Sequence, residues 1–146
     1  MRDIQNSFVY GRYFRQIVFH VMQLQDELLA PYNITSQQAR TLGFIYLMRE
    51  QRGAVCQKDL EEYFGLSGSS VTSLLKGLEG KGYIRRQASR EDGRAKLLSL
   101  TDKGKKLHDA FMEKLEESEG KIVAGMTQNE RATLLELLKK AADNIK

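Results

Sequence analysis

The stretch "QKDLEEYFGLSGSSVTSLLKGLEGKGYI", residues 57–84, contains two apolar-striped segments separated by a break that holds a glycine. Residues 57–64 are predicted to form a short helix that ends at Gly65, because glycine readily adopts the left-handed backbone that closes helices. Ser67 can cap a second helix, whose apolar side chains recur at helical spacing until the glycine-rich stop at residues 80–82. A short helix, a tight turn and a second helix make up a helix-turn-helix unit.

The second of these helices has a face suited to close contact with nucleic acid. With its apolar stripe buried, the remaining side chains are small and polar near its N-terminus, followed by one lysine; they are Gly68, Ser69, Ser70, Thr72, Ser73 and Lys76. Small hydroxyl residues allow a helix to approach bases and donate hydrogen bonds to phosphates, and a helix N-terminus attracts anions. On this pattern alone an ordinary helical hairpin with a polar face remains open, because helix-turn-helix patterns are easily imitated by chance.

Two short runs with strand character follow this unit. They span residues 83–88 and 95–100, and "SREDGR" at residues 89–94 separates them. The Asp-Gly pair is a strong signal for a hairpin turn. On the second run Leu98 and Leu100 share one face, so they can pack on the domain. The sequence therefore predicts a β-hairpin wing beside the helix-turn-helix unit.

The outer surface of this hairpin is basic. Lys96 and the tip residues Arg90 and Arg94 are expected outside the core, and a thin hairpin can place an arginine in the minor groove, where the negative potential is enhanced. Arg85 and Arg86 on the first strand add to the charge. We expect the acidic tip residue, at position 92, to orient a nearby arginine through a charge-assisted hydrogen bond.

The charge of the chain is concentrated in this region. Residues 67–106 hold ten Lys and Arg but four Asp and Glu, a net charge of +6, whereas the whole chain carries +4. Such asymmetry is typical of a surface that meets a polyanion, most simply nucleic acid. A solvated basic face is the alternative that charge alone leaves open.

These motifs resemble a known family. "LSGSSVTSLLKGLEGKGYIRRQASREDGRAKLLSLTDKG", residues 66–104, is similar to the winged-helix core of the MarR family of prokaryotic transcription regulators. The resemblance includes the Asp-x-Arg of the wing, Asp92 and Arg94, and the Leu-Thr-x-x-Gly exit, Leu100, Thr101 and Gly104. It implies a mainly α fold with a small β-wing, in which long dimerisation helices flank a winged helix-turn-helix core. It also implies a homodimeric repressor or activator that binds double-stranded DNA and is often released by a small ligand or by cysteine oxidation.

The resemblance also assigns a set of DNA-binding residues. Together with the basic residues noted above, the expected contacts are Ser67, Ser69, Ser70, Thr72, Ser73, Lys76, Arg85, Arg86, Arg90 and Arg94, with Asp92 as the wing-orienting residue. Many relatives carry a basic residue where this chain has Gly68, and another where it has Ser73. Specificity is therefore expected to depend more on Lys76, on the wing and on DNA shape.

Helices are also predicted on both sides of the core. Residues 4–30 have apolar side chains at helical spacing and precede Pro31, the only proline. Thr35 with Gln38 forms a capping box, so a second helix should begin there and run toward Arg52.

The C-terminal part repeats these signals. Thr101 can cap a helix that begins at Asp102, and Thr127 with Glu130 is a capping box that opens the last helix. One small core cannot bury all the apolar side chains of these helices and of the first, so we expect them to pack against a second copy. A monomeric helical bundle is the alternative.

The chain thus divides into three parts. Residues 1–34 are expected to form an N-terminal dimerisation helix, residues 35–101 the DNA-binding lobe, and residues 102–146 the C-terminal helices that complete the dimer interface.

Sites for regulation are weakly marked. Cys56 is the only cysteine and is a candidate redox sensor, although it has no resolving cysteine and no basic residue directly beside it in the sequence. Alternatively, Cys56 is a small, partly buried residue at a position where relatives often have a capping threonine. The aromatic residues Tyr10, Tyr13, Phe14, Phe44 and Tyr46 could line a crevice for a small aromatic effector, or simply pack in the core. His20 and His108 are expected on a polar face or an interface, and we expect no metal and no cofactor.

Other classes of function find no support in the sequence. The chain has no positioned nucleophile, no carboxylate pair in a cleft and no phosphate-binding loop, so we expect no enzyme. Its polar N-terminal segment and short apolar runs predict a soluble cytoplasmic protein without a membrane span. A winged-helix module that binds another protein, without specific DNA binding, is the remaining alternative.

Overall fold

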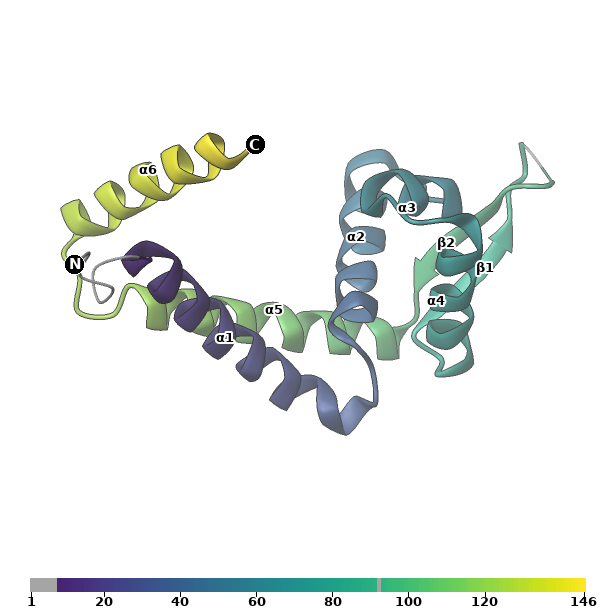
Figure 1. The fold of residues 1–146 in the computed structure, drawn as a ribbon. Helices are drawn as coiled ribbons and strands as arrows, with labels where there is room; N and C mark the ends of the chain where they lie inside the picture. The colour runs from purple at the N-terminus through teal and green to yellow at the C-terminus, as the bar shows by residue number, and fades with distance from the viewer. Residues whose placement is uncertain (1–7, 92) are drawn as a thin grey trace.

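The computed structural model describes residues 8–91 and 93–146 and is mainly helical, with one small sheet (Figure 1). The elements are α1 (Val9–Leu29), a 3-10 turn η1 (Ala30–Tyr32), α2 (Ser36–Arg52), α3 (Gln57–Phe64), α4 (Gly68–Gly80), β1 (Ile84–Ala88), β2 (Lys96–Leu100), α5 (Asp102–Ile122) and α6 (Gln128–Ile145). The fold class predicted from the sequence, a winged helix-turn-helix core with long flanking helices, is confirmed.

Local capping signals set the helix boundaries. The Thr35 hydroxyl accepts from the Gln38 amide while the Gln38 side chain accepts from the Thr35 amide, and a second capping box starts α6 at residues 127–130. Gly65 ends α3 in the left-handed conformation, with φ of 62°. The expected helix start at Ile4 lies outside the described residues. The first helix ends at Leu29, because the backbone tightens into η1 around the proline.

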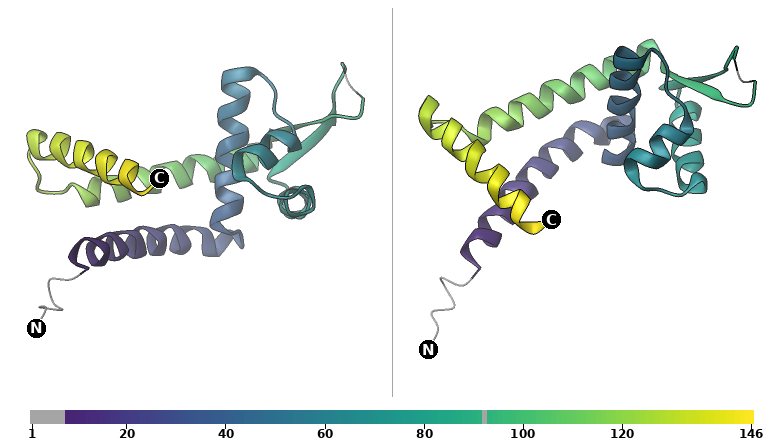
Figure 2. Two further views of the ribbon diagram at one scale, coloured as in Figure 1. Left: turned by 45° about the horizontal axis from the view of Figure 1, so that its top comes forward. Right: turned by 90° about the horizontal axis from the view of Figure 1, so that it is seen from above.

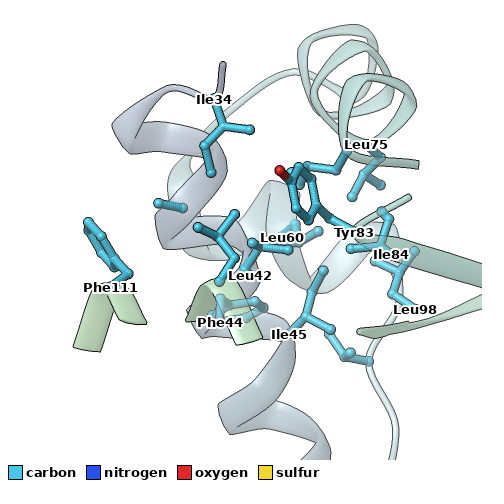
Figure 3. Close-up of a cluster of buried hydrophobic side chains, with 14 of the residues drawn as sticks. Ile34, Leu42, Phe44, Ile45, Leu60, Leu75, Tyr83, Ile84, Leu98 and Phe111 are labelled. Carbon is cyan, nitrogen blue, oxygen red and sulfur yellow. The ribbon is translucent and has the colours of Figure 1, made fainter. Parts of the chain in front are cut away.

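The core lies where α2, α3, α4, the hairpin and the start of α5 meet (Figure 3). Leu42 and Ile45 of α2, Leu60 of α3 and Leu75 of α4 are fully buried, and Leu98 of β2 closes the cluster. These positions include the apolar stripes seen in the sequence. The core therefore holds the helix-turn-helix unit and the hairpin together as one lobe.

The hairpin is antiparallel, with Ile84 opposite Leu100 and Ala88 opposite Lys96. Its strands are one residue shorter at their starts than expected. A bridge between Cys56 and Leu97 adds the segment before α3 to the sheet, and the Leu98 amide donates to the Val55 carbonyl at 2.9 Å. The wing is thus anchored to α3 by its second strand.

The long helices extend away from this lobe. α1 and α5 contact each other, whereas α6 lies at the end of the molecule far from the wing (Figures 1 and 2). No residue of α6 is buried, and its Leu135 and Leu137 are 54% and 59% exposed. α1 likewise exposes Ile17 and Val18. These helices have apolar faces that a single chain does not cover.

Candidate DNA-binding surface

Serine hydroxyls gather at the N-terminus of α4. The Ser67 Oγ accepts from the Ser70 amide at 3.2 Å, and the hydroxyls of Ser69 and Ser70 lie 3.1 and 2.9 Å from it. All three residues are exposed. Hydroxyl groups and free amides at a helix N-terminus can bind phosphate, so this end of α4 is suited to an anion.

A side-chain amide from α3 secures the start of α4. The Nε2 atom of Gln57 lies 3.0 Å from Glu61 Oε1, 3.1 Å from the Gly68 carbonyl and 2.9 Å from Thr72 Oγ1. Sequence reasoning missed Gln57, because the contacts with residues 68 and 72 depend on how the two helices pack. The only sequence signal was its i,i+4 spacing from Glu61.

A basic groove runs between α4 and the hairpin. One hollow of about 530 Å³ is lined by Lys76, Glu79, Gly80, Arg86, Ala88 and Lys96. An adjoining one of about 480 Å³ is lined by Cys56, Gln57, Lys58, Leu75, Arg86, Arg94, Ala95, Lys96 and Leu98. The two hollows share Arg86 and Lys96, and their lining contains five basic residues and one acidic residue. The groove can therefore hold a polyanionic strand between the helix and the wing.

Arg86 forms the floor of this groove. Its Nε lies 2.6 Å from Glu79 Oε2, and its side chain is 15% exposed, against 47% for Glu79. Its Nε and Nη2 are buried, and neither makes a hydrogen bond among the described residues. The ion pair with Glu79 holds the guanidinium in place while the Nη2 group remains without a partner in that part of the chain.

The remaining predicted site residues have three outcomes. Ser73, Lys76, Arg90 and Arg94 are exposed on α4 or on the hairpin, and Lys96 is exposed, as expected for a residue outside the core. Arg85 is exposed as well, but alternation along β1 places it on the face opposite Arg86, so the fold does not bring it into the groove. Asp92 lies outside the described residues.

Cys56 begins α3 as its N-cap residue and lines the groove. Its amide donates to Asp59 Oδ2 at 2.8 Å, and its side chain is partly exposed. The fold brings Lys58, Arg86 and Arg94 to the same hollow, although Lys58 is the only one near Cys56 in the sequence. Its role as a redox sensor stays a prediction.

A separate pocket lies between the lobe and α5. It has a volume of about 580 Å³ and is lined by Ala39, Arg40, Gly43, Phe44, Tyr46, Leu47, Tyr63, Phe64, His108, Phe111, Met112 and Leu115. Of the expected aromatic set, Phe44 and Tyr46 line it, whereas Tyr10, Tyr13 and Phe14 do not. Tyr63 and Phe64 were missed, because only the packing of α3 on α2 places them beside Phe44.

The expectation that His108 lies on a polar face or an interface is wrong. It is buried against Tyr46, with ring centroids 4.8 Å apart, because its position on α5 turns it toward α2. Its Nδ1 is buried with no hydrogen-bond partner in residues 8–91 and 93–146. Burial is the main cause that lowers the pKa of His108 below its ordinary value; Lys105 also lowers it, against an opposite effect of Asp109.

The lowered pKa of His108 makes the free energy of unfolding depend on pH. The unfolded chain takes up a proton at His108 more readily than the folded chain does. The free energy of unfolding should therefore be highest above about pH 6.5 and fall as the pH drops through the unfolded pKa. We expect the free energy of unfolding, measured in urea, to fall less between pH 7.5 and pH 5.5 for His108→Phe than for the unchanged protein.

His20→Gln is the control, because it removes the exposed histidine. If the free energy of unfolding fell equally in His108→Phe and in the unchanged protein, the pH dependence would not come from His108.

Among the described residues, no three His, Cys, Asp or Glu side chains gather where they could hold a metal ion. No helix in that part of the chain is long and apolar enough to span a membrane.

The helix-turn-helix unit, the wing and the basic groove define a winged-helix transcriptional regulator. The sequence profile of the MarR family matches residues 32–95. The chain belongs to the MarR family. Members of this family are transcriptional regulators and not enzymes.

Solved structures and a curated relative agree with this assignment. A MarR family transcriptional regulator from Clostridium acetobutylicum is 34% identical with a TM-score of 0.74, over 94% of this chain and 99% of that one. MepR of S. aureus, in its complex with DNA, is 30% identical with a TM-score of 0.76, over 94% and 100%. MepR bound to ethidium bromide is 30% identical with a TM-score of 0.72, over 97% and 99%. The HTH-type transcriptional regulator YwaE of Bacillus subtilis (strain 168) is 28% identical over 124 residues, which are 85% of this chain and 70% of YwaE.

Proposed function

We propose that the protein is a sequence-specific repressor that binds a palindromic operator as a homodimer. The observation that carries this proposal is the basic groove between α4 and the hairpin. A helix with small polar side chains fits the major groove, and a hairpin with arginines at its tip fits the adjacent minor groove. The sugar-phosphate strand between the two grooves would then lie over Arg86 and Lys96. Because its target is DNA, we place the protein in the cytoplasm.

The dimer is supported by the uncovered apolar faces of α1 and α6. We propose that residues 1–34 and 102–146 form the dimer interface and that residues 35–101 form the DNA-binding lobe. Closed two-fold dimers are the commonest oligomers, and such a dimer would set two recognition helices about one DNA turn apart.

The test is fluorescence anisotropy with the duplex upstream of the protein's own gene and with a scrambled duplex, over a series of salt concentrations. Preferential binding that persists at physiological salt is the expected result. Equal binding to both duplexes that vanishes as salt rises would show only electrostatic attraction. Indifference to duplex DNA even at low salt would instead favour a protein-interaction module.

Arg94→Ala should weaken binding to the preferred duplex by at least about tenfold, because a charge-assisted hydrogen bond in the minor groove is lost. The same anisotropy assay measures the change. Arg52→Ala is the matched control, since it removes an exposed arginine at the end of α2 that lines neither hollow of the basic groove. An affinity unchanged by Arg94→Ala would exclude the wing from the DNA contact.

We also propose that a small aromatic effector releases the protein from DNA by binding in the pocket between α2, α3 and α5. Aromatic walls and one buried polar atom, His108 Nδ1, suit a planar ligand with a polar group. The effector must bind the DNA-incompetent conformation more tightly than the competent one. Aromatic acids, amines and neutral compounds are added in turn to the DNA complex. A compound that acts as an effector should release the DNA and lower its anisotropy, whereas the others should leave the anisotropy unchanged.

A further inference from the structure

The contacts of Gln57 fix which way its amide points. Glu61 Oε1 and the Gly68 carbonyl are both acceptors and lie 3.0 and 3.1 Å from the same Gln57 atom. Only the NH₂ end of the amide can face two acceptors. The orientation of Gln57 is therefore set by its partners.

This orientation also sets the role of the Thr72 hydroxyl. The NH₂ group of Gln57 has two hydrogens for three acceptors, and Thr72 Oγ1 is the nearest of them, at 2.9 Å from Nε2. One N–H therefore donates to the Thr72 hydroxyl oxygen, and the other is shared between Glu61 Oε1 and the Gly68 carbonyl. The hydroxyl hydrogen is then left to donate elsewhere. A hydroxyl that accepts one hydrogen bond is polarised toward donating another. Thr72 is partly exposed on α4, so its donor can point toward a ligand of that helix.

Gly68 leaves room for the Glu61 carboxylate that contacts Gln57. A Cβ added at position 68 would lie 3.1 Å from Glu61 Oε1, the carboxylate that holds the Gln57 amide. A side chain at position 68 would therefore push against Glu61. The glycine at a position where many relatives are basic has a local structural reason.

We propose that Gln57 is a positioning residue that holds Thr72 as a hydrogen-bond donor for base readout in the major groove; this rests on the proposed sequence-specific DNA binding. Guanine, adenine and thymine each offer an acceptor on their major-groove edge, whereas cytosine offers only its N4 amino donor. A hydroxyl held as a donor therefore favours guanine, adenine or thymine over cytosine at the base that faces Thr72. One position in each half of the operator should discriminate against cytosine for this reason.

The experiment begins with a 30-base-pair duplex selected from a randomised pool by the unchanged protein. Every base pair of the selected duplex is then substituted, and affinities are measured by competition anisotropy. Four proteins are compared: the unchanged chain, Thr72→Val, the double variant Gln57→Glu with Glu61→Gln, and the single variant Glu61→Gln. Thr72→Val keeps the shape of the side chain and removes the hydroxyl. The double variant keeps both side-chain lengths and the net charge but places an acceptor beside Thr72.

We expect Thr72→Val to lose about 3–10-fold of discrimination against cytosine at one position per half-site, with an unchanged salt dependence. The double variant should lose the same discrimination at the same position and keep the other preferences. Thermal unfolding of each variant shows that the fold is retained, and Glu61→Gln alone is the control that leaves Gln57 as a donor.

Three results would overturn the proposal. A loss shared equally by all sequences, with a weaker salt dependence, would make Thr72 a phosphate contact. Unchanged base preferences in the double variant would remove the positioning role of Gln57. A pool from which no preferred duplex emerges would refute the proposed function itself and, with it, this inference.

Discussion

Replacing Leu135 and Leu138 with glutamate is expected to dissociate the proposed homodimer into monomers and to lower the affinity for the preferred duplex by at least about 100-fold. Both leucines are exposed on α6, so their replacement should leave the fold of one chain intact. In a dimer they would be buried, and burying a leucine contributes about 1.5–3 kcal/mol that a carboxylate cannot supply. A monomer has only one recognition helix. It therefore loses the affinity gained from two joined binding modules, which is about 10²–10⁴-fold.

Sedimentation velocity measures the change of mass, and anisotropy measures the affinity. A variant with Lys139→Glu and Lys140→Glu is the control, because it adds acidic charge to the same helix without removing apolar surface. If the leucine variant remained a dimer, α6 would have to lie outside the interface.

The helix-turn-helix unit and the wing could be predicted because their signals are local. Ser67 caps α4 and Gly65 closes α3 through contacts within a few residues, and such contacts are readable from spacing. The Asp-Gly signal likewise predicted the hairpin from residues that are adjacent in the chain.

The finer parts of the site could not be predicted, because they depend on packing between elements. Gln57 reaches Thr72 only when α3 and α4 cross as they do. His108 is buried because α5 turns it toward Tyr46, and a lone histidine in a charged helix gives no sign of this. The division of Arg85 and Arg86 between two faces needed the register of the hairpin.

The Leu-Thr-x-x-Gly motif after the wing could be recognised in the sequence, and its physical reason lies in the hydrogen bonds of Thr101. Thr101 caps α5 by accepting from the Gly104 amide at 3.1 Å, and its hydroxyl donates to the Gly82 carbonyl at 2.6 Å. The Thr101 amide donates to the Tyr83 carbonyl at 3.0 Å. These bonds join the start of α5 to the turn that precedes β1.

Gly104→Ala should therefore destabilise the protein more than other glycine substitutions in its helices. An added Cβ would lie 2.0 Å from the Tyr83 carbonyl oxygen and 3.2 Å from Leu100 Cδ2. The carbonyl belongs to buried backbone that already accepts from Thr101, so it cannot move away without breaking that bond. Overpacking of this kind costs about 1–3 kcal/mol, measured as a lower free energy of unfolding in urea.

Gly120→Ala is the matched control, because it lies in the same helix and its added Cβ would meet no atom within 4 Å. It should stabilise the helix by about 0.5–1 kcal/mol. The hydrogen bonds around Gly104 tie the wing to α5, which leads toward the proposed dimer interface. Gly104→Ala should therefore also weaken DNA binding, whereas Gly120→Ala should not. Equal stability of the two variants would mean that the wing and α5 can separate at this joint without cost, and the wing would then no longer be positioned by α5.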